Sequence, residues 1–169
     1  MVAGSVANSG TFKVSTPSDT EIRLTRLFNA PRHLVFEAMT RVEHVSQWWG
    51  GNSGGYSMGP CEIDLRIGGA WKFVSRHPKG EAVFYGTYQE ITPPSRLVFT
   101  EFYAPFPDSG SVVIADFTEE NGKTRLTVTA RYPSKEVRDF VLSTGMEKGA
   151  AASYDRLEEV AAKLLGTQV

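Results

Sequence analysis

The chain has 169 residues, of which 41% are hydrophobic and 22% are charged, and its formal net charge at pH 7 is -1. This length suits one domain with its own core, and the composition is that of a globular protein, neither disordered nor fibrous. The near-neutral charge leaves no excess of Lys and Arg to neutralise phosphates. We therefore expect no nucleic-acid partner.

The first residues of the chain predict a flexible arm. Residues 1–19 are rich in Ser, Thr, Gly and Asn, which favours an N-terminal arm, and residues 20–166 form the single predicted domain. Residues 1–9 lack a basic region followed by an apolar run, so we expect no signal peptide. No apolar run approaches the ~20 residues that span a bilayer, so we expect no membrane insertion.

A strand and two short helices are predicted next. Apolar residues alternate with polar ones over residues 21–28, which is typical of a strand. Pro31 then begins a helix over residues 31–39, because a proline at the first helical position needs no amide partner. A second helical turn covers residues 42–48.

A loop and a series of strands follow. Residues 50–59 include glycines at 50, 51, 54 and 55 but lack the Lys and Ser/Thr pattern of a phosphate-binding loop, so we interpret them as a plain loop. Turn signals at short, regular intervals, among them Gly68-Gly69 and Asn121-Gly122, predict one continuous antiparallel sheet. Residues 104–110, rich in proline, are expected to connect two of its strands. The predicted strands are 61–67, 70–76, 82–90, 96–102, 111–118 and 123–132.

The C-terminal part has helical periodicity. Ser134 can cap a short helix, and apolar residues from Met146 to Leu164 form a stripe along a longer one that ends near Gly166. A long helix that arrives last buries its stripe by lying across the concave face of the sheet. The sequence therefore predicts an α+β fold: a curved antiparallel sheet wrapped around a long C-terminal helix, with two short helices after the first strand.

Three stretches of sequence resemble the activator of heat-shock-protein ATPase homologue family. They are Phe28-Asn29-Ala30-Pro31, the pair Trp48-Trp49, and the hairpin from Asp64 to Trp71 with its Asp-x-Arg-x-Gly-Gly pattern. The late segment from Gly145 to Gly149 fits as well. This family belongs to the START-like, helix-grip (SRPBCC) superfamily. The resemblance covers about residues 21–165 and specifies a fold, but no particular chemistry.

The resemblance implies a cavity between the sheet and the long helix. Members of the superfamily bind lipids, hormones, polyketides or other apolar molecules, and some catalyse reactions on them. The family takes its name from a eukaryotic co-chaperone in which an additional N-terminal domain supplies much of the contact with the chaperone. These 169 residues hold no counterpart of that domain, so a chaperone contact is a weaker expectation than a small apolar ligand.

The aromatic side chains are the main candidates for the cavity wall. Large rings on a concave face leave gaps that a ligand can fill, although ordinary core packing would use the same residues. Asp64 and Arg66, two apart on a predicted strand, share a face and could orient a polar group of the ligand. The alternative, which we favour, is a structural ion pair beside the turn, because paired charges near a tight hairpin are common at protein surfaces. The predicted ligand-binding residues are Trp48, Trp49, Asp64, Arg66, Trp71, Phe73, Phe84, Phe99, Tyr103 and Met146.

No catalytic set can be assigned. The single cysteine, Cys61, fits a reducing, cytoplasmic setting, and the three histidines His33, His44 and His77 lack the short spacing of metal ligands. We expect neither a metal nor another cofactor. Polar groups that could sit in the wall are Tyr85, Glu101, Tyr103 and Asp116.

Three functions remain open. The first is binding of a small hydrophobic or amphipathic molecule. The second is an enzyme of cyclase, hydrolase or lyase type that acts on such a molecule, which a perturbed ionisable group facing an open pocket would favour. The third is a chaperone-associated interaction module, which a large exposed apolar patch would favour. An exposed strand edge could also pair two subunits as a homodimer.

Overall fold

The structure is a computed structural model that describes residues 9–50 and 55–167. The strands are β1 Lys13–Ser15, β2 Glu21–Phe28, β3 Ser57–Ile63, β4 Ala70–His77, β5 Gly80–Thr92, β6 Arg96–Tyr103, β7 Phe106–Glu120 and β8 Lys123–Arg131. The helices are α1 Arg32–Thr40, α2 Val42–Trp48, α3 Lys135–Ser143 and α4 Met146–Gly166, with a 3-10 turn, η2, at Ser9–Thr11.

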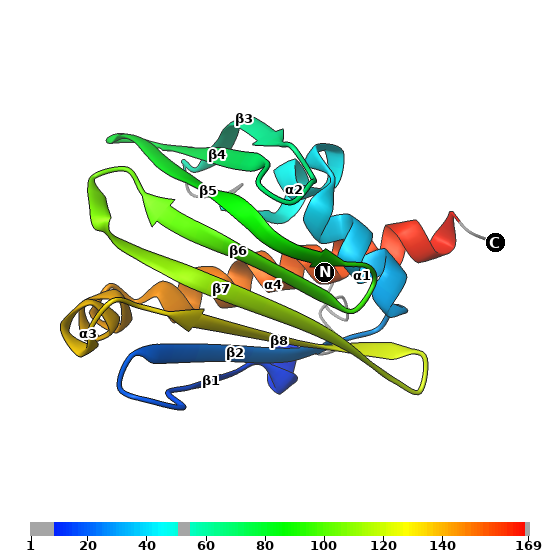
Figure 1. Cartoon of the computed structure of the whole chain (residues 1–169). Helices are drawn as coiled ribbons and strands as arrows, with labels where there is room; N and C mark the ends of the chain where they lie inside the picture. Colours follow the sequence, from blue (N-terminus) through cyan, green and yellow to red (C-terminus); the bar gives the residue numbers. More distant parts are fainter. Residues whose placement is uncertain (1–8, 51–54, 168–169) are drawn as a thin grey trace.

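The strands form one antiparallel sheet in the order β1-β2-β8-β7-β6-β5-β4-β3 (Figure 1). Strands β3 to β8 follow one another as hairpins, and β2 closes the order by pairing with β8 along its whole length, from Glu21 opposite Arg131 to Phe28 opposite Thr124. The two short helices lie between β2 and β3 in the chain. Apart from the position of β1 and β2, neighbouring strands in the sheet are also consecutive in the sequence.

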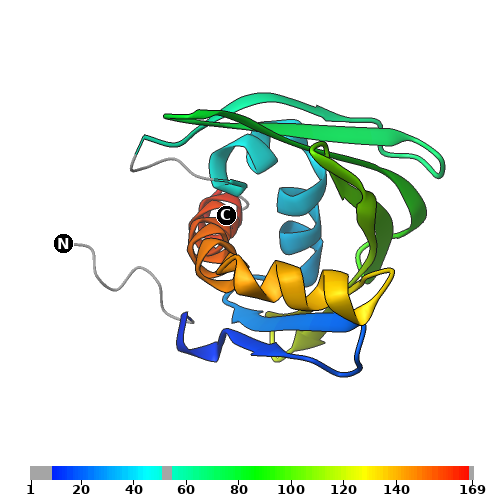
Figure 2. The same cartoon turned by 90° about the vertical axis from the view of Figure 1, so that its left-hand side faces the viewer.

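The concave face of the sheet carries the core. Along β2 every second residue is buried, and the same alternation runs through Ser111 to Phe117 of β7. Alternate side chains of a strand point to opposite faces, so these two strands each bury one face. Seen along the sheet, the strands curve round α1, α2 and α4 (Figure 2).

Helix α4 fills the groove of the sheet. Its buried residues include Tyr154, Leu157, Val160 and Ala161, which are spaced three or four apart, as one face of a helix requires. The helix starts after Gly145, whose φ of 76° favours glycine. The preceding helix α3 is capped by Ser134, whose side chain accepts a hydrogen bond from the Val137 amide, as the sequence predicts.

A buried ion pair ties α4 to β2. Arg26, fully buried on the concave face of β2, donates from Nη1 to Asp155 Oδ1 at 2.5 Å, and its Nη2 lies 3.6 Å from Glu158 Oε1. The Arg26 guanidinium also lies 5.1 Å from the centre of the Phe28 ring. Because a buried charge needs partners of opposite sign, this pair fixes where α4 crosses the sheet.

The α+β helix-grip fold predicted from the sequence is confirmed. The first strand, the two short helices and the long C-terminal helix fall within a residue or two of the expected bounds. Three segments differ from the predicted structure: the N-terminal arm and the connections β3–β4 and β6–β7. Of the predicted arm, residues 1–8 lie outside the described residues, but Lys13–Ser15 form strand β1, paired with Arg23 to Thr25 of β2.

The connection between β3 and β4 is longer than the sequence predicts. Strand β3 starts at Ser57 and ends at Ile63, and a register shift between Met58 and Cys61 accommodates Pro60 on this edge strand. Gly68 and Gly69 do not form a two-residue turn. Their backbones instead exchange hydrogen bonds of 2.8 and 3.0 Å with Tyr88 of β5.

The connection between β6 and β7 is shorter than predicted. Residues 104–105 form a two-residue turn that Tyr103 and Phe106 close as partners. The register then shifts before Glu101 pairs with Ser111, so β7 contains extra residues there. Pro107 is tolerated in this stretch because a bulge interrupts the ladder of backbone hydrogen bonds.

Candidate ligand cavity

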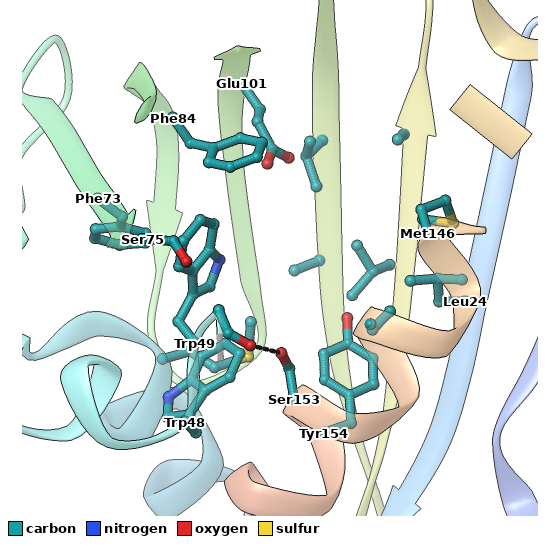
Figure 3. A pocket seen from close by; sticks show the side chains of 18 of the residues that line it. Leu24, Trp48, Trp49, Phe73, Ser75, Phe84, Glu101, Met146, Ser153 and Tyr154 are labelled. Carbon is teal, nitrogen blue, oxygen red and sulfur yellow. Dashed lines mark hydrogen bonds between the residues drawn. The ribbon is translucent and has the colours of Figure 1, made fainter. Parts of the chain in front are cut away.

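A cavity of about 480 Å³ lies between the concave face of the sheet and α4 (Figure 3). Strands β2 and β4 to β8, helices α1, α2 and α4, and the segment at Gly50 and Tyr56 all contribute to its wall. Of the ten predicted ligand-binding residues, seven line it: Trp48, Trp49, Trp71, Phe73, Phe84, Phe99 and Met146.

One part of the wall is a cluster of aromatic rings. Trp49 packs against Phe73 and Phe84, with ring centres 5.2 and 5.0 Å apart, and Trp71 packs against Phe73 at 4.8 Å and Phe99 at 5.7 Å. These contacts are edge-on or tilted, which is the geometry that aromatic pairs prefer. The cluster gives the cavity a stiff apolar surface.

Trp71 is held in place by Thr100 of β6. Its indole nitrogen donates a hydrogen bond of 3.0 Å to the Thr100 carbonyl, while the Thr87 amide binds the Thr100 hydroxyl at 2.9 Å. Gly86 makes room for this arrangement, because a side chain there would collide with the Thr100 carbonyl and come within 2.8 Å of the indole nitrogen. The glycine therefore determines where the Trp71 ring lies.

The Trp48 ring and the backbone at Gly50 are each held by hydrogen bonds at the end of α2. Trp48 donates from its indole nitrogen to the Ala38 carbonyl of α1 at 2.8 Å. From α4, Arg156 donates to the Gly50 carbonyl at 2.5 Å, and Ser153 donates to the same oxygen at 3.2 Å. Arg156 was not among the predicted residues, because an Arg on a long helix gives no signal of such a contact.

Three of the predicted residues lie elsewhere. Tyr103 lies opposite Phe84 on the neighbouring strand and stacks on its ring at 4.9 Å, but it does not line the cavity. Asp64 and Arg66 are at the surface, with side chains 50% and 77% exposed, and pair with each other at 2.8 Å. Their placement in the cavity is wrong because residues 64–69 form a connection, where the two-residue period of a strand does not apply. The structural ion pair that the sequence favoured is what the structure shows.

Glu101 is the one acidic side chain among the described residues that line the cavity. It projects from β6 into the cavity close to Phe84 (Figure 3). Burial raises the pKa of its carboxyl to about 7, and no described residue donates a hydrogen bond to it. Its charge in turn contributes to raising the pKa of Tyr132 and Tyr154, after the larger effect of their own burial.

The other polar candidates of the sequence do not reach the cavity. Tyr85 stacks on Phe102 at 5.4 Å, on the opposite face of the sheet, and Asp116 pairs with Arg96 at 2.9 Å. Tyr154 lines the cavity without having been predicted, although the helical stripe through Ala150 and Leu157 places it on the same face.

Other reactive groups give no sign of a metal centre or an activated thiol. Burial raises the pKa of the Cys61 thiol to about 11, so it stays protonated near neutral pH. Within residues 9–50 and 55–167, no group of three or more His, Cys, Asp or Glu side chains is arranged to hold a metal ion. No helix in this part of the chain is long and apolar enough to cross a membrane.

A curved antiparallel sheet that grips a long C-terminal helix, with a cavity between them, defines the helix-grip class of proteins. The family described as "Activator of Hsp90 ATPase homolog 1-like protein" matches residues 29–162. The chain belongs to this family, as its sequence motifs indicate.

Solved structures share the fold at low sequence identity. A Rhodobacter sphaeroides protein is 23% identical with a TM-score of 0.82, covering 90% of this chain and 99% of its own. A protein from Nitrosomonas europaea is 22% identical with a TM-score of 0.77, covering 88% and 98% of the two chains. One from Mycobacterium smegmatis is 24% identical, also at 0.77, covering 88% and 94%. No protein of curated function matches the chain.

Proposed function

We propose that this protein binds a small hydrophobic or amphipathic molecule in the cavity between the sheet and α4. The observation that carries the proposal is the size of the cavity together with its wall. Protein interiors are normally packed to the density of organic crystals, and voids larger than a few waters are uncommon. A space of about 480 Å³ is in the range of ligand pockets, and aromatic rings form much of its wall.

The surface gives less support to the alternative of an interaction module. The exposed large apolar residues of the described chain are spread over several elements, and they include Val42, Leu65, Ile67 and Leu165. Only Phe106 and Phe140, with ring centres 5.8 Å apart, are in ring contact with each other among them. Scattered apolar residues are normal for a soluble surface, whereas a docking patch would be contiguous.

Filling the cavity tests the proposal. Ala150 lines the cavity from α4, and Ala152, two residues further along the same helix, is exposed. We expect Ala150→Phe to weaken binding of the uncharged fluorescent probe N-phenyl-1-naphthylamine at least about tenfold, because the new ring takes the space of the ligand. Fluorescence titration of the purified protein measures this.

Ala152→Phe is the matched control, since it adds the same ring to the same helix outside the cavity. It should bind the probe as the wild type does. Equal loss in both variants, or no loss in either, would place the probe outside the cavity. Failure of the wild type to bind it would contradict the proposal.

A further inference from the structure

The charges around the cavity are one-sided. Among the described residues, its wall contains Glu101 but no Lys or Arg. A fatty acid or another anionic amphiphile would bring a second negative charge near Glu101 with no Lys or Arg in the wall to receive it, and like charges at short range repel. The wall therefore disfavours ligands whose polar end is anionic.

We infer that the ligand is an amphipathic molecule with a basic amine, whose ammonium group pairs with the Glu101 carboxylate while its apolar part lies among the aromatic rings. This inference rests on the proposed function and specifies the class of ligand. An ammonium group supplies both the positive charge and the hydrogen-bond donors that the carboxylate lacks in the described structure.

The rings beside Glu101 suit the same cation. Phe84 lies next to the carboxyl, and Tyr154 rises from α4 toward the same space (Figure 3). The faces of aromatic rings are negative, so they attract an ammonium group, and the attraction grows when water is excluded. A carboxylate together with aromatic rings in one cavity therefore favours an alkylammonium group over a neutral alcohol.

The energetic cost of the buried carboxylate already exists in the free protein. Burial raises the pKa of Glu101 to about 7, so near neutral pH the group is partly protonated. An amine of high pKa binds the ionised form, so its affinity should rise as the pH is raised through 7. From pH 6 to pH 8 the ionised fraction rises about tenfold, and the affinity for the amine should follow.

Few other groups facing the cavity can interfere with this dependence. Tyr132, which follows β8, and Tyr154 of α4 face Glu101, and burial raises the pKa of both hydroxyls, so they stay neutral. Tyr88 of β5 behaves in the same way. The remaining ionisable residues of the wall are Tyr56 and His77, whose rings contact each other at 5.7 Å.

The test compares three ligands that differ only at their polar end: 4-phenylbutylamine, 4-phenylbutanol and 4-phenylbutanoic acid. Each displaces N-phenyl-1-naphthylamine in a competition titration at pH 6 and at pH 8. We expect the amine to bind about tenfold or more tightly than the alcohol at pH 8, and the acid to bind weakest. Only the amine should gain about tenfold between the two pH values.

Glu101→Gln removes the charge and keeps the shape of the side chain. In this variant the preference for the amine and its pH dependence should both disappear, while the alcohol still binds. Glu119→Gln, at an exposed position on β7, is the control and should behave as the wild type.

Two results would overturn the inference alone: equal displacement by amine and alcohol in the wild type, or a preference for the amine that survives Glu101→Gln. In both cases the probe still binds, so the proposed function stands. If neither the probe nor any of the three ligands binds, the proposed function falls and the inference falls with it.

Discussion

Glu101 is a costly residue for the fold. Its carboxyl lies in an apolar cavity, half-buried, with no hydrogen-bond donor among the described residues. On the neighbouring strand β7, Ser111 lies opposite Glu101 and cannot neutralise its charge. A carboxylate that is withdrawn from water without a partner destabilises the folded state. A neutral side chain at this position would therefore give a more stable fold than an ionised Glu101.

The cost of Glu101 should be visible as a dependence of stability on pH. Its pKa is about 7 in the folded chain and near the ordinary 4.5 in the unfolded chain, so between these values the folded state holds more protons. Its contribution to the free energy of unfolding therefore falls as the pH rises through this window. We expect the stability of Glu101→Gln relative to wild type to increase by about 2–3 kcal/mol from pH 5 to pH 8, measured by urea denaturation.

The control for this pH comparison is a carboxylate that is exposed to solvent. Glu119→Gln, on the exposed side of β7, should show no such change between the two pH values. If the two variants respond to pH alike, the Glu101 carboxyl is not desolvated, and the tenfold pH effect on amine binding loses its basis as well.

At the scale of the element, α4 contributes both to the core and to the cavity. Its N-terminal half provides Met146, Ala150 and Tyr154 to the cavity wall, and its C-terminal half packs Leu157, Val160 and Ala161 into the core. The buried Arg26 pairs with Asp155 and Glu158 between these two parts. The helix is thus anchored at its centre and C-terminal half, which leaves its N-terminal half free to border a space.

This division of α4 predicts a large difference between two leucines. Leu157 is 0% exposed and Leu165 is 40% exposed. Leu157→Ala should lower the free energy of unfolding by about 2–5 kcal/mol, because it leaves a void in the core. Leu165→Ala should change it by less than about 0.5 kcal/mol. Equal effects in chemical denaturation would contradict the docking of α4 described here.

The elements that the sequence predicts well are those with a long, regular pattern. The alternation over residues 21–28 and the apolar stripe of α4 each repeat often enough to specify a face. The misplaced connections depend on features outside the turns themselves: the Gly68 amide binds the Tyr88 carbonyl of β5, and a register shift between β6 and β7 follows the turn at Pro105. Local turn signals cannot reveal such partners, and Asp64 and Arg66 were misplaced for this reason.

The cavity wall was predictable where it is aromatic and not where it is polar. Rings such as Trp71 and Phe84 stand out by size, and seven of the ten chosen residues line the space. Glu101 appeared only as one of four polar candidates, because a period of two tells which residues share a face but not which face closes over a void. Ser153 and Arg156 act through the backbone carbonyl of Gly50, which sequence patterns do not report.

At the scale of the whole molecule, the cavity joins parts of the chain that are distant in sequence. Leu24 of β2, Trp49 beside α2, Phe84 of β5 and Ala150 of α4 all border it. The pairing of β2 with β8 completes the curved sheet, and α4 lies across it (Figures 1 and 2). A molecule in the cavity would therefore contact elements from both ends of the fold at once.

Occupation of the cavity should consequently stabilise the fold as a unit. N-phenyl-1-naphthylamine at ten times its dissociation constant should add about 1.4 kcal/mol to the free energy of unfolding, provided that the unfolded chain does not bind it. For a chain of this length we expect the thermal midpoint to rise by about 3–6 °C in calorimetry. Ala150→Phe should show no rise at the same probe concentration, whereas Ala152→Phe should rise like the wild type. A rise of equal size in both variants would mean that the probe stabilises the protein from a site outside the cavity.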